Sequence, residues 1–176
     1  MREQFRKPIR AALFRALAET EAAIGPAARS AFIPANNVFD ALATLATLFG
    51  AATRSLLIID PYMDEKALTD FARLAPEGVR INLMADARHV KPGLKPAAQA
   101  WISQFGAARP LDVRLAPSRS LHDRAIIVDD TDAWILTQSL NAFAARSPAT
   151  IARVDAQSAQ LKIDAYGDIW RSATPI

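Results

Sequence analysis

The stretch Ser120-Leu-His-Asp-Arg-Ala-Ile-Ile-Val-Asp-Asp130 lies between two other apolar segments, residues 111–115 and 133–136, and a turn separates it from each. This pattern predicts three consecutive strands. Because side chains alternate along a strand, one face is expected to carry His122, Arg124, Ile126 and Val128. An imidazole beside a guanidinium at the start of that face indicates a site for an anionic ligand. The alternative is a solvated strand start in which His122 caps a turn.

Composition limits the classes of protein and site. The chain has 176 residues, which suits one domain with its own core, and it has no cysteine, which excludes disulfides, cysteine zinc sites and thiol catalysis. It has only two histidines, so a metal site would depend mainly on carboxylates. The net charge of +3 and the pI of about 9.6 favour anionic partners such as phosphates, nucleic acid or acidic lipid.

The N-terminal part is expected to be an addition to the main domain. An apolar stripe predicts an amphipathic helix from Lys7 to Ala23, and Gly25-Pro26 ends it before a loop over residues 27–35. Its basic side chains favour a solvated face over an arm for membrane or nucleic acid. No apolar run reaches the roughly 18 residues that span a bilayer, and the N-terminus does not resemble a secretory signal. We therefore predict a cytoplasmic protein with a helix and loop over 1–36 and one domain over 37–176.

Strands and helices alternate through that domain. Strands are predicted over 55–59, 79–84 and 150–154, and helices begin at Asn36 or Asn37, after Tyr62, at Pro92 and at Ala156. This alternation predicts a layered α/β fold, with a mixed, mainly parallel sheet and helices on both faces. The residues expected to be buried in it are Leu57, Ile59, Ile81, Leu83, Ile126 and Val128.

Polar residues follow two of the predicted parallel strands. Asp60 and Tyr62 follow the first, and Asp86, Arg88 and His89 follow the second. In open α/β sheets, ligands bind beyond the carboxyl ends of the strands. Arg88 and His89 are therefore candidate phosphate-binding residues. The alternative for each of these residues is a capping or turn role, and Asp60, which precedes a proline, suits a cap.

The pattern His122-x-Arg124-x-x-x-x-Asp129, followed by Gln138-Ser139-Leu140-Asn141, resembles the signature of the phospholipase D superfamily. That signature is His-x-Lys with an Asp five residues after the Lys, and Gly-Ser-x-Asn on the following strand. The segment Leu57-Ile-Ile-Asp-Pro-Tyr-Met-Asp64 also resembles the opening strand and turn of bacterial members. The resemblance covers roughly residues 38–172.

The resemblance implies a phosphodiesterase that works through a phosphohistidine without a metal or other cofactor. One His attacks phosphorus, a second His protonates the leaving oxygen, and His122, Arg124, Ser139 and Asn141 are the implied catalytic residues. Arg124, Ser139 and Asn141 would hold the non-bridging oxygens of the phosphodiester ligand. The chain has one motif, so the resemblance also implies a homodimer that pairs two copies of His122.

This chain departs from the family pattern at several positions. Arg124 replaces the Lys, Gln138 replaces the Gly, and the segment 149–154 lacks the carboxylate that orients the His in active members. Asp129 is too far along a straight strand to do so, about 23 Å from His122 at 3.3 Å per residue, and is interpreted as a structural residue of the hairpin turn.

Two hypotheses follow from these departures. One is a phosphodiesterase, with nucleic acid favoured over lipid as the substrate. The other is an inactive phospholipase D-like module that binds phosphate groups of lipid or nucleic acid, because the His-Asp-Arg form also resembles the lipid-binding domain that follows the microtubule-interacting and trafficking domain.

Overall fold

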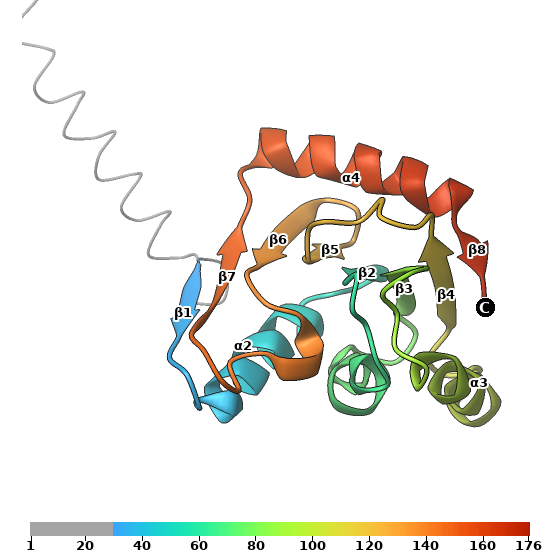
Figure 1. Cartoon of the computed structure of the whole chain (residues 1–176), viewed down its shortest axis with the longest axis horizontal. Coiled ribbons are helices and arrows are strands. Elements are labelled where there is room, and N and C mark those ends of the chain that lie inside the picture. The colour runs from blue at the N-terminus through green and yellow to red at the C-terminus, as the bar shows by residue number, and fades with distance from the viewer. Residues whose placement is uncertain (1–29) are drawn as a thin grey trace, which may run out of the picture.

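The computed structural model describes residues 30–176, so the helix predicted over Lys7–Ala23 lies outside the described residues (Figure 1). The described strands are β1 (Ala31–Ile33), β2 (Ser55–Ile59), β3 (Arg80–Asp86), β4 (Leu111–Ala116), β5 (Ala125–Val128), β6 (Asp132–Leu136), β7 (Ala149–Arg153) and β8 (Thr174–Pro175). The helices are α2 (Val38–Gly50), α3 (Leu94–Phe105) and α4 (Ala156–Ser172), with a π-helical turn at Ala67–Phe71 and 3₁₀ turns at Ala72–Leu74 and Leu140–Ala142.

The strands form one eight-stranded sheet in the order β1-β7-β6-β5-β2-β3-β4-β8. The pairs β2–β3 and β3–β4 are parallel, and the other pairs are antiparallel. The predicted mixed sheet is confirmed, but the prediction that it is mainly parallel was wrong. Helical crossovers join only β2 to β3 and β3 to β4, whereas β5 and β6 are joined by a tight hairpin, which requires antiparallel pairing.

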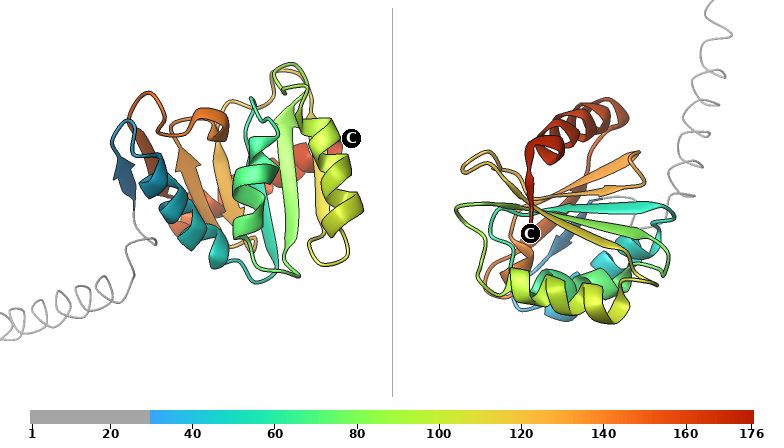
Figure 2. Two further views of the ribbon diagram at one scale, coloured as in Figure 1. Left: turned by 90° about the horizontal axis from the view of Figure 1, so that it is seen from below. Right: turned by 90° about the vertical axis from the view of Figure 1, so that its right-hand side faces the viewer.

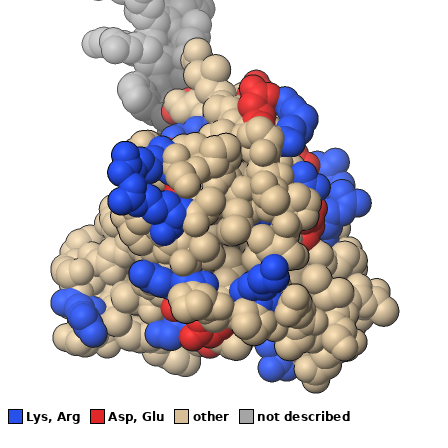
Figure 3. All heavy atoms as spheres, turned by 45° about the vertical axis from the view of Figure 1, so that its right-hand side comes forward, with Lys and Arg blue, Asp and Glu red and all other residues tan. Residues whose placement is uncertain are grey.

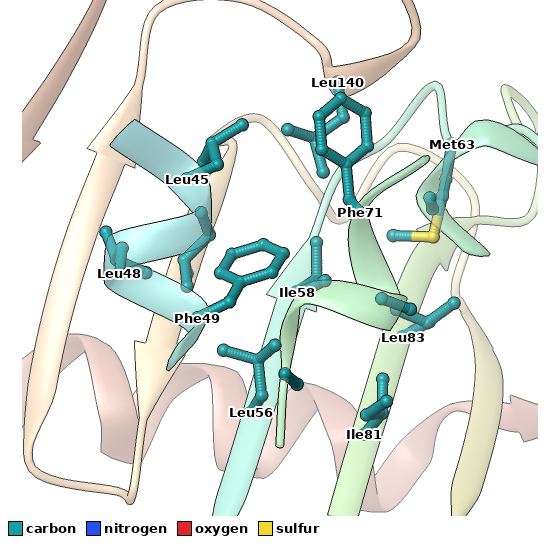
Figure 4. Packing of buried hydrophobic residues seen from close by; sticks show 14 of the residues in the cluster. Leu45, Leu48, Phe49, Leu56, Ile58, Met63, Phe71, Ile81, Leu83 and Leu140 are labelled. Atoms are coloured by element: carbon teal, nitrogen blue, oxygen red, sulfur yellow. The ribbon is translucent and has the colours of Figure 1, made fainter. Parts of the chain in front are cut away.

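Helices cover both faces of the sheet, as predicted. Helix α4 crosses one face alone, while α2, the turns after Tyr62 and α3 cover the other (Figure 2). The larger core lies under the second group, where Leu45 and Phe49 of α2 pack against Leu56 and Ile58 of β2 (Figure 4). Five of the six side chains predicted to be buried are buried; Leu57 is half-buried, since it points towards α4 at the smaller core.

Two local predictions were wrong because long-range contacts overrode the local pattern, and a third segment differs in its type of helix. Residues 31–33 belong to the segment predicted to be a loop, but they pair with β7 as strand β1. The helix predicted after Tyr62 is present as a short helical segment, but its geometry is π-helical over Ala67–Phe71 and 3₁₀ over Ala72–Leu74. Residues 120–124 are not part of a strand, and β5 begins only at Ala125.

The hairpin turn after β5 is attached to the start of β2 by Asp129. Both Asp129 and Asp130 have φ of 55°, a left-handed conformation that Asp tolerates better than most residues. The Asp129 carboxylate accepts hydrogen bonds from the backbone N–H groups of Thr53, Arg54 and Ser55, at 2.7–3.1 Å, and from the Thr53 hydroxyl at 2.7 Å. Burial raises its pKa, but these donors together lower it well below the usual value for Asp.

We predict that Asp129→Asn lowers the free energy of unfolding at pH 7 by about 1–3 kcal/mol, the range for losing hydrogen bonds to a charged group. A group with a lowered folded-state pKa stabilises the protein above its unfolded pKa, about 3.9 for Asp, and that contribution is lost as pH falls. Urea unfolding should therefore show a difference between wild type and Asp129→Asn that narrows below about pH 4. A difference that stayed constant from pH 7 to about pH 2.5 would contradict this.

Candidate functional site

Four segments meet beyond the carboxyl ends of β2 and β3. Two are the connections that leave these parallel neighbours, residues 60–66 and 87–91. The third is residues 117–124, which precede β5, and the fourth is residues 138–142, which follow β6. Backbone hydrogen bonds join them: Ala87 N–H donates to the Ala116 carbonyl and Lys91 N–H to the Met63 carbonyl. The ends of the strands therefore place these segments around one site.

Asp60 connects the first and last of these segments. It is a buried carboxylate, and one oxygen accepts the Tyr62 backbone N–H at 3.0 Å. The other oxygen accepts the Ser139 hydroxyl at 2.6 Å and the Leu140 backbone N–H at 2.9 Å. Asp60 thus forms the local turn expected of a residue before proline, and it also fixes the position of the Ser139 segment.

Tyr62 holds two of the predicted binding residues on one aromatic ring. The Arg124 guanidinium carbon lies 5.4 Å from the ring centroid, in cation–π range. The His89 ring lies 5.1 Å from it, tilted by 52°. The Tyr62 backbone carbonyl accepts the Asn141 amide at 3.3 Å. Arg124 Nε is buried and has no hydrogen-bond partner among the described residues.

Asp86 and His89 form a carboxylate–imidazole pair beside Tyr62. His89 Nδ1 lies 3.1 Å from Asp86 Oδ1, the Asp86 side chain is fully buried, and the His89 side chain is 35% exposed. Burial raises the pKa of Asp86, but backbone N–H groups of Arg88 and Arg119 and the His89 ring together lower it below the usual value. The carboxylate is therefore ionised near neutral pH. The Arg88 side chain is exposed.

His122 is exposed, and no hydrogen bond to its side chain occurs within residues 30–176. The next residue, Asp123, contacts α4 on the opposite face of the sheet, where it accepts Lys162 Nζ at 2.6 Å and the Tyr166 hydroxyl at 2.8 Å. The Lys162 hydrogen bond is the main cause of a lowered Asp123 pKa, while burial and Asp123 raise the pKa of Tyr166. The Asp123 carboxylate is thus held by hydrogen bonds from α4.

The loop from Gln138 to Asn141 is fastened by its own side chains. Gln138, at the position of the family Gly, donates its amide to the Ser147 and Pro148 carbonyls and accepts the Ala144 backbone N–H at 3.2 Å. Ser139 donates to Asp60 and Asn141 to Tyr62. Lys66 Nζ donates to the Asn141 carbonyl at 2.9 Å. The larger Gln side chain therefore makes contacts that no Gly could make.

The structure brings together most, but not all, of the predicted site residues. Arg124, His89, Ser139 and Asn141 are connected through Tyr62 and Asp60, whereas Asp129 lies at the opposite end of β2. Lys66 was missed, because no local pattern distinguishes it from a solvated lysine. Within residues 30–176 no group of three potential metal ligands occurs, and no helix is long and apolar enough to cross a membrane.

Solved structures share this arrangement of strands and helices. A phospholipase D family member, Nuc from Salmonella typhimurium, is 16% identical, with a TM-score of 0.61 over 84% of this chain and 98% of that one. The chain has a phospholipase D-like fold. NucT from Helicobacter pylori is 14% identical, with a TM-score of 0.56 over 84% of this chain and 99% of that one.

A third similar structure extends over nearly the whole chain. The archaeal chromatin protein TrmBL2 is 15% identical, with a TM-score of 0.52 over 99% of this chain and 64% of that one. No family model and no curated protein matches the sequence.

We predict that Asp60→Ala lowers the free energy of unfolding by about 1–3 kcal/mol, because the Leu140 N–H and the Ser139 hydroxyl lose a charged acceptor. Asp64→Ala is the matched control, since Asp64 lies four residues along the same connection and, within residues 30–176, its carboxylate accepts only the Lys66 backbone N–H. Thermal unfolding of both variants measures the difference. Equal melting temperatures would show that Asp60 does not hold the loop.

Proposed function

We propose that this protein binds phosphodiesters at the Tyr62 edge of the sheet and cleaves them through a phosphohistidine on His122. The observation that carries the proposal is the Arg124 guanidinium on the Tyr62 ring beside an imidazole, with a buried Nε left free of protein partners among the described residues. A fixed cation next to an imidazole suits a reaction in which charge develops on phosphoryl oxygens. His122 lies two residues from Arg124, in the segment that leads directly into β5.

The proposed reaction has two steps. His122 attacks phosphorus and displaces the leaving oxygen, and water then attacks the phosphohistidine and releases the product. Arg124 holds the non-bridging oxygens throughout. Each step needs a proton to be delivered or removed, and the homodimer proposed from the single motif would supply a second imidazole from the His122 of another copy.

Nucleic acid is the proposed substrate class. The net charge of +3 favours a polyanionic ligand. TrmBL2, which has a similar fold, is a chromatin protein with a novel mode of DNA binding. On the face shown in Figure 3, Lys and Arg groups are separated by uncharged and acidic surface instead of forming a continuous stripe. This distribution favours a local phosphate contact over a long groove for a duplex.

A binding module without turnover is the second candidate, and one observation favours it. Both loop donors of the motif point to the protein, Ser139 to Asp60 and Asn141 to the Tyr62 carbonyl. His122 also lacks a carboxylate partner among the described residues. A site of this kind retains Arg124 as an anion contact and loses the orientation of the nucleophile.

Hydrolysis of bis-p-nitrophenyl phosphate in EDTA distinguishes the two candidates. We predict that wild type releases p-nitrophenolate, that His122→Ala abolishes release because no covalent intermediate forms, and that Arg124→Lys retains activity because it restores the family residue. A wild type with no turnover, together with an inactive Arg124→Lys, would support the binding module. Activity that survives His122→Ala and disappears in EDTA would refute both.

We also predict that Arg124→Ala weakens binding of a short single-stranded oligonucleotide by about 1.5–3 kcal/mol, the range for a hydrogen bond to a charged group. Arg171→Ala on α4 is the matched control, because it removes the same charge from an exposed ion pair with Asp168 on the other face of the sheet. Fluorescence anisotropy at one fixed salt concentration measures both variants. Equal affinities for the two variants would place the phosphate contact away from Arg124.

A further inference from the structure

We infer that His89, oriented by Asp86, is the proton donor and acceptor of the reaction within a single chain. The inference rests on the proposed phosphodiesterase function and names the source of its second imidazole. On this basis the catalytic pair is His122 and His89 of one molecule, and a second copy of His122 is not required.

The segments that carry the two histidines lie at the same edge of the sheet. His89 and His122 are the only histidines in the sequence. The Tyr62 ring links the two segments directly, since it contacts the His89 ring and lies 5.4 Å from the guanidinium carbon of Arg124, two residues after His122. A phosphate held by Arg124 is therefore bound beside His89, and His122 is two residues from Arg124 along the chain.

His89 also has the carboxylate partner that His122 lacks in the described residues, namely Asp86, at 3.1 Å. Asp86 is buried and its pKa is lowered, so it is ionised and can only accept a hydrogen bond. The proton of this bond is therefore on Nδ1 of His89. Nε2 is then the nitrogen left to exchange a proton with a ligand.

The His89 ring is accessible to a ligand. A carboxylate–imidazole pair that serves only to close a turn can be covered by protein, but the His89 side chain keeps 35% of its surface exposed. Asp86 is also held by the Arg88 backbone N–H at 2.9 Å, so its position does not depend on His89. A carboxylate fixed by the backbone beside a partly exposed imidazole is an arrangement suited to acid–base catalysis.

Protons and bonds balance in the resulting scheme. As His122 forms its bond to phosphorus, the bond from phosphorus to the leaving oxygen breaks, and Nε2 of protonated His89 gives its proton to that oxygen. Water then attacks phosphorus while Nε2 of His89 takes its proton, and the bond between phosphorus and His122 breaks. His89 ends protonated, as it began, and Asp86 stays ionised throughout.

Leaving-group dependence tests the role of His89. A p-nitrophenolate departs without protonation, whereas an alkoxide of a nucleotide needs an acid. With bis-p-nitrophenyl phosphate, His89→Gln should give a burst of about one p-nitrophenolate per chain and then a slow steady rate, because formation of the phosphohistidine survives and hydrolysis does not. With a dinucleotide, both steps should slow, by about 10²–10⁴-fold overall, the usual contribution of a general acid–base group.

The controls separate this inference from the proposed function. Lys95→Ala, on the exposed side of α3, should turn over both substrates as wild type does. The wild-type rate per chain should stay constant when the protein is diluted to concentrations at which any dimer would dissociate. A wild type whose rate per chain falls on dilution, together with an unaffected His89→Gln, would overturn the inference and retain phosphodiesterase function. A wild type inactive on both substrates would overturn both.

Nitrogen NMR of ¹⁵N-histidine protein tests the Asp86 contact without activity. The two histidines are assigned from His122→Ala, and neutral His89 should carry its proton on Nδ1. Asp86→Asn, which removes the negative charge and keeps only a weaker, neutral acceptor, should lower the fraction of neutral His89 that carries its proton on Nδ1 and should slow turnover. A proton on Nε2 of neutral His89 in the wild type would overturn the assignment of Asp86 as its positioning residue.

Discussion

A single buried carboxylate organises the site. Asp60 lies at the end of β2, where its two oxygens satisfy three donors from two separate parts of the chain, the Tyr62 turn and the Ser139 loop. A charge at this depth is tolerated only if hydrogen bonds replace the lost water, so the Tyr62 turn and the Ser139 loop are held in place together. The Tyr62 ring then fixes how far Arg124 and His89 lie from each other. The arrangement proposed to bind an anion is in this sense a consequence of satisfying Asp60.

The departures from the family motif form a consistent set in three dimensions. Arg is longer than Lys and planar, and here its guanidinium packs on Tyr62, a contact for which a planar cation is well suited. Gln138 closes the loop to residues 147–148, which a Gly would leave free. Arg124 and Gln138 thus hold their neighbours in fixed positions, where Lys and Gly would leave them free to move. The carboxylate–imidazole pair, Asp86 and His89, lies at the end of β3 and not at the motif histidine His122. A carboxylate paired with an imidazole is thus present, but at a different position of the fold.

Much of this arrangement could be predicted from the sequence because it depends on local periodicity. The alternation that puts Ile126 and Val128 in the core and the polar residues after β2 and β3 are visible in a few consecutive residues. The bond between Ser139 and Asp60 joins residues 79 positions apart, and no local pattern records it. The same holds for β1, whose three residues are a strand only because β7 is beside them. Residues 120–124, where the motif begins, were predicted to belong to a strand. They do not, because Asp123 accepts hydrogen bonds from Lys162 and Tyr166 of α4.

The two edges of the sheet have a consequence for aggregation. β1 contributes three residues and β8 two. An edge strand with few free N–H and C=O groups gives another chain little to pair with, and proline removes a donor altogether. Pro34 directly follows β1, and Pro175 lies within β8. An eight-stranded sheet rich in Ile, Leu and Val would otherwise favour pairing with other chains at its edges, and here the two shortest described strands lie at those edges.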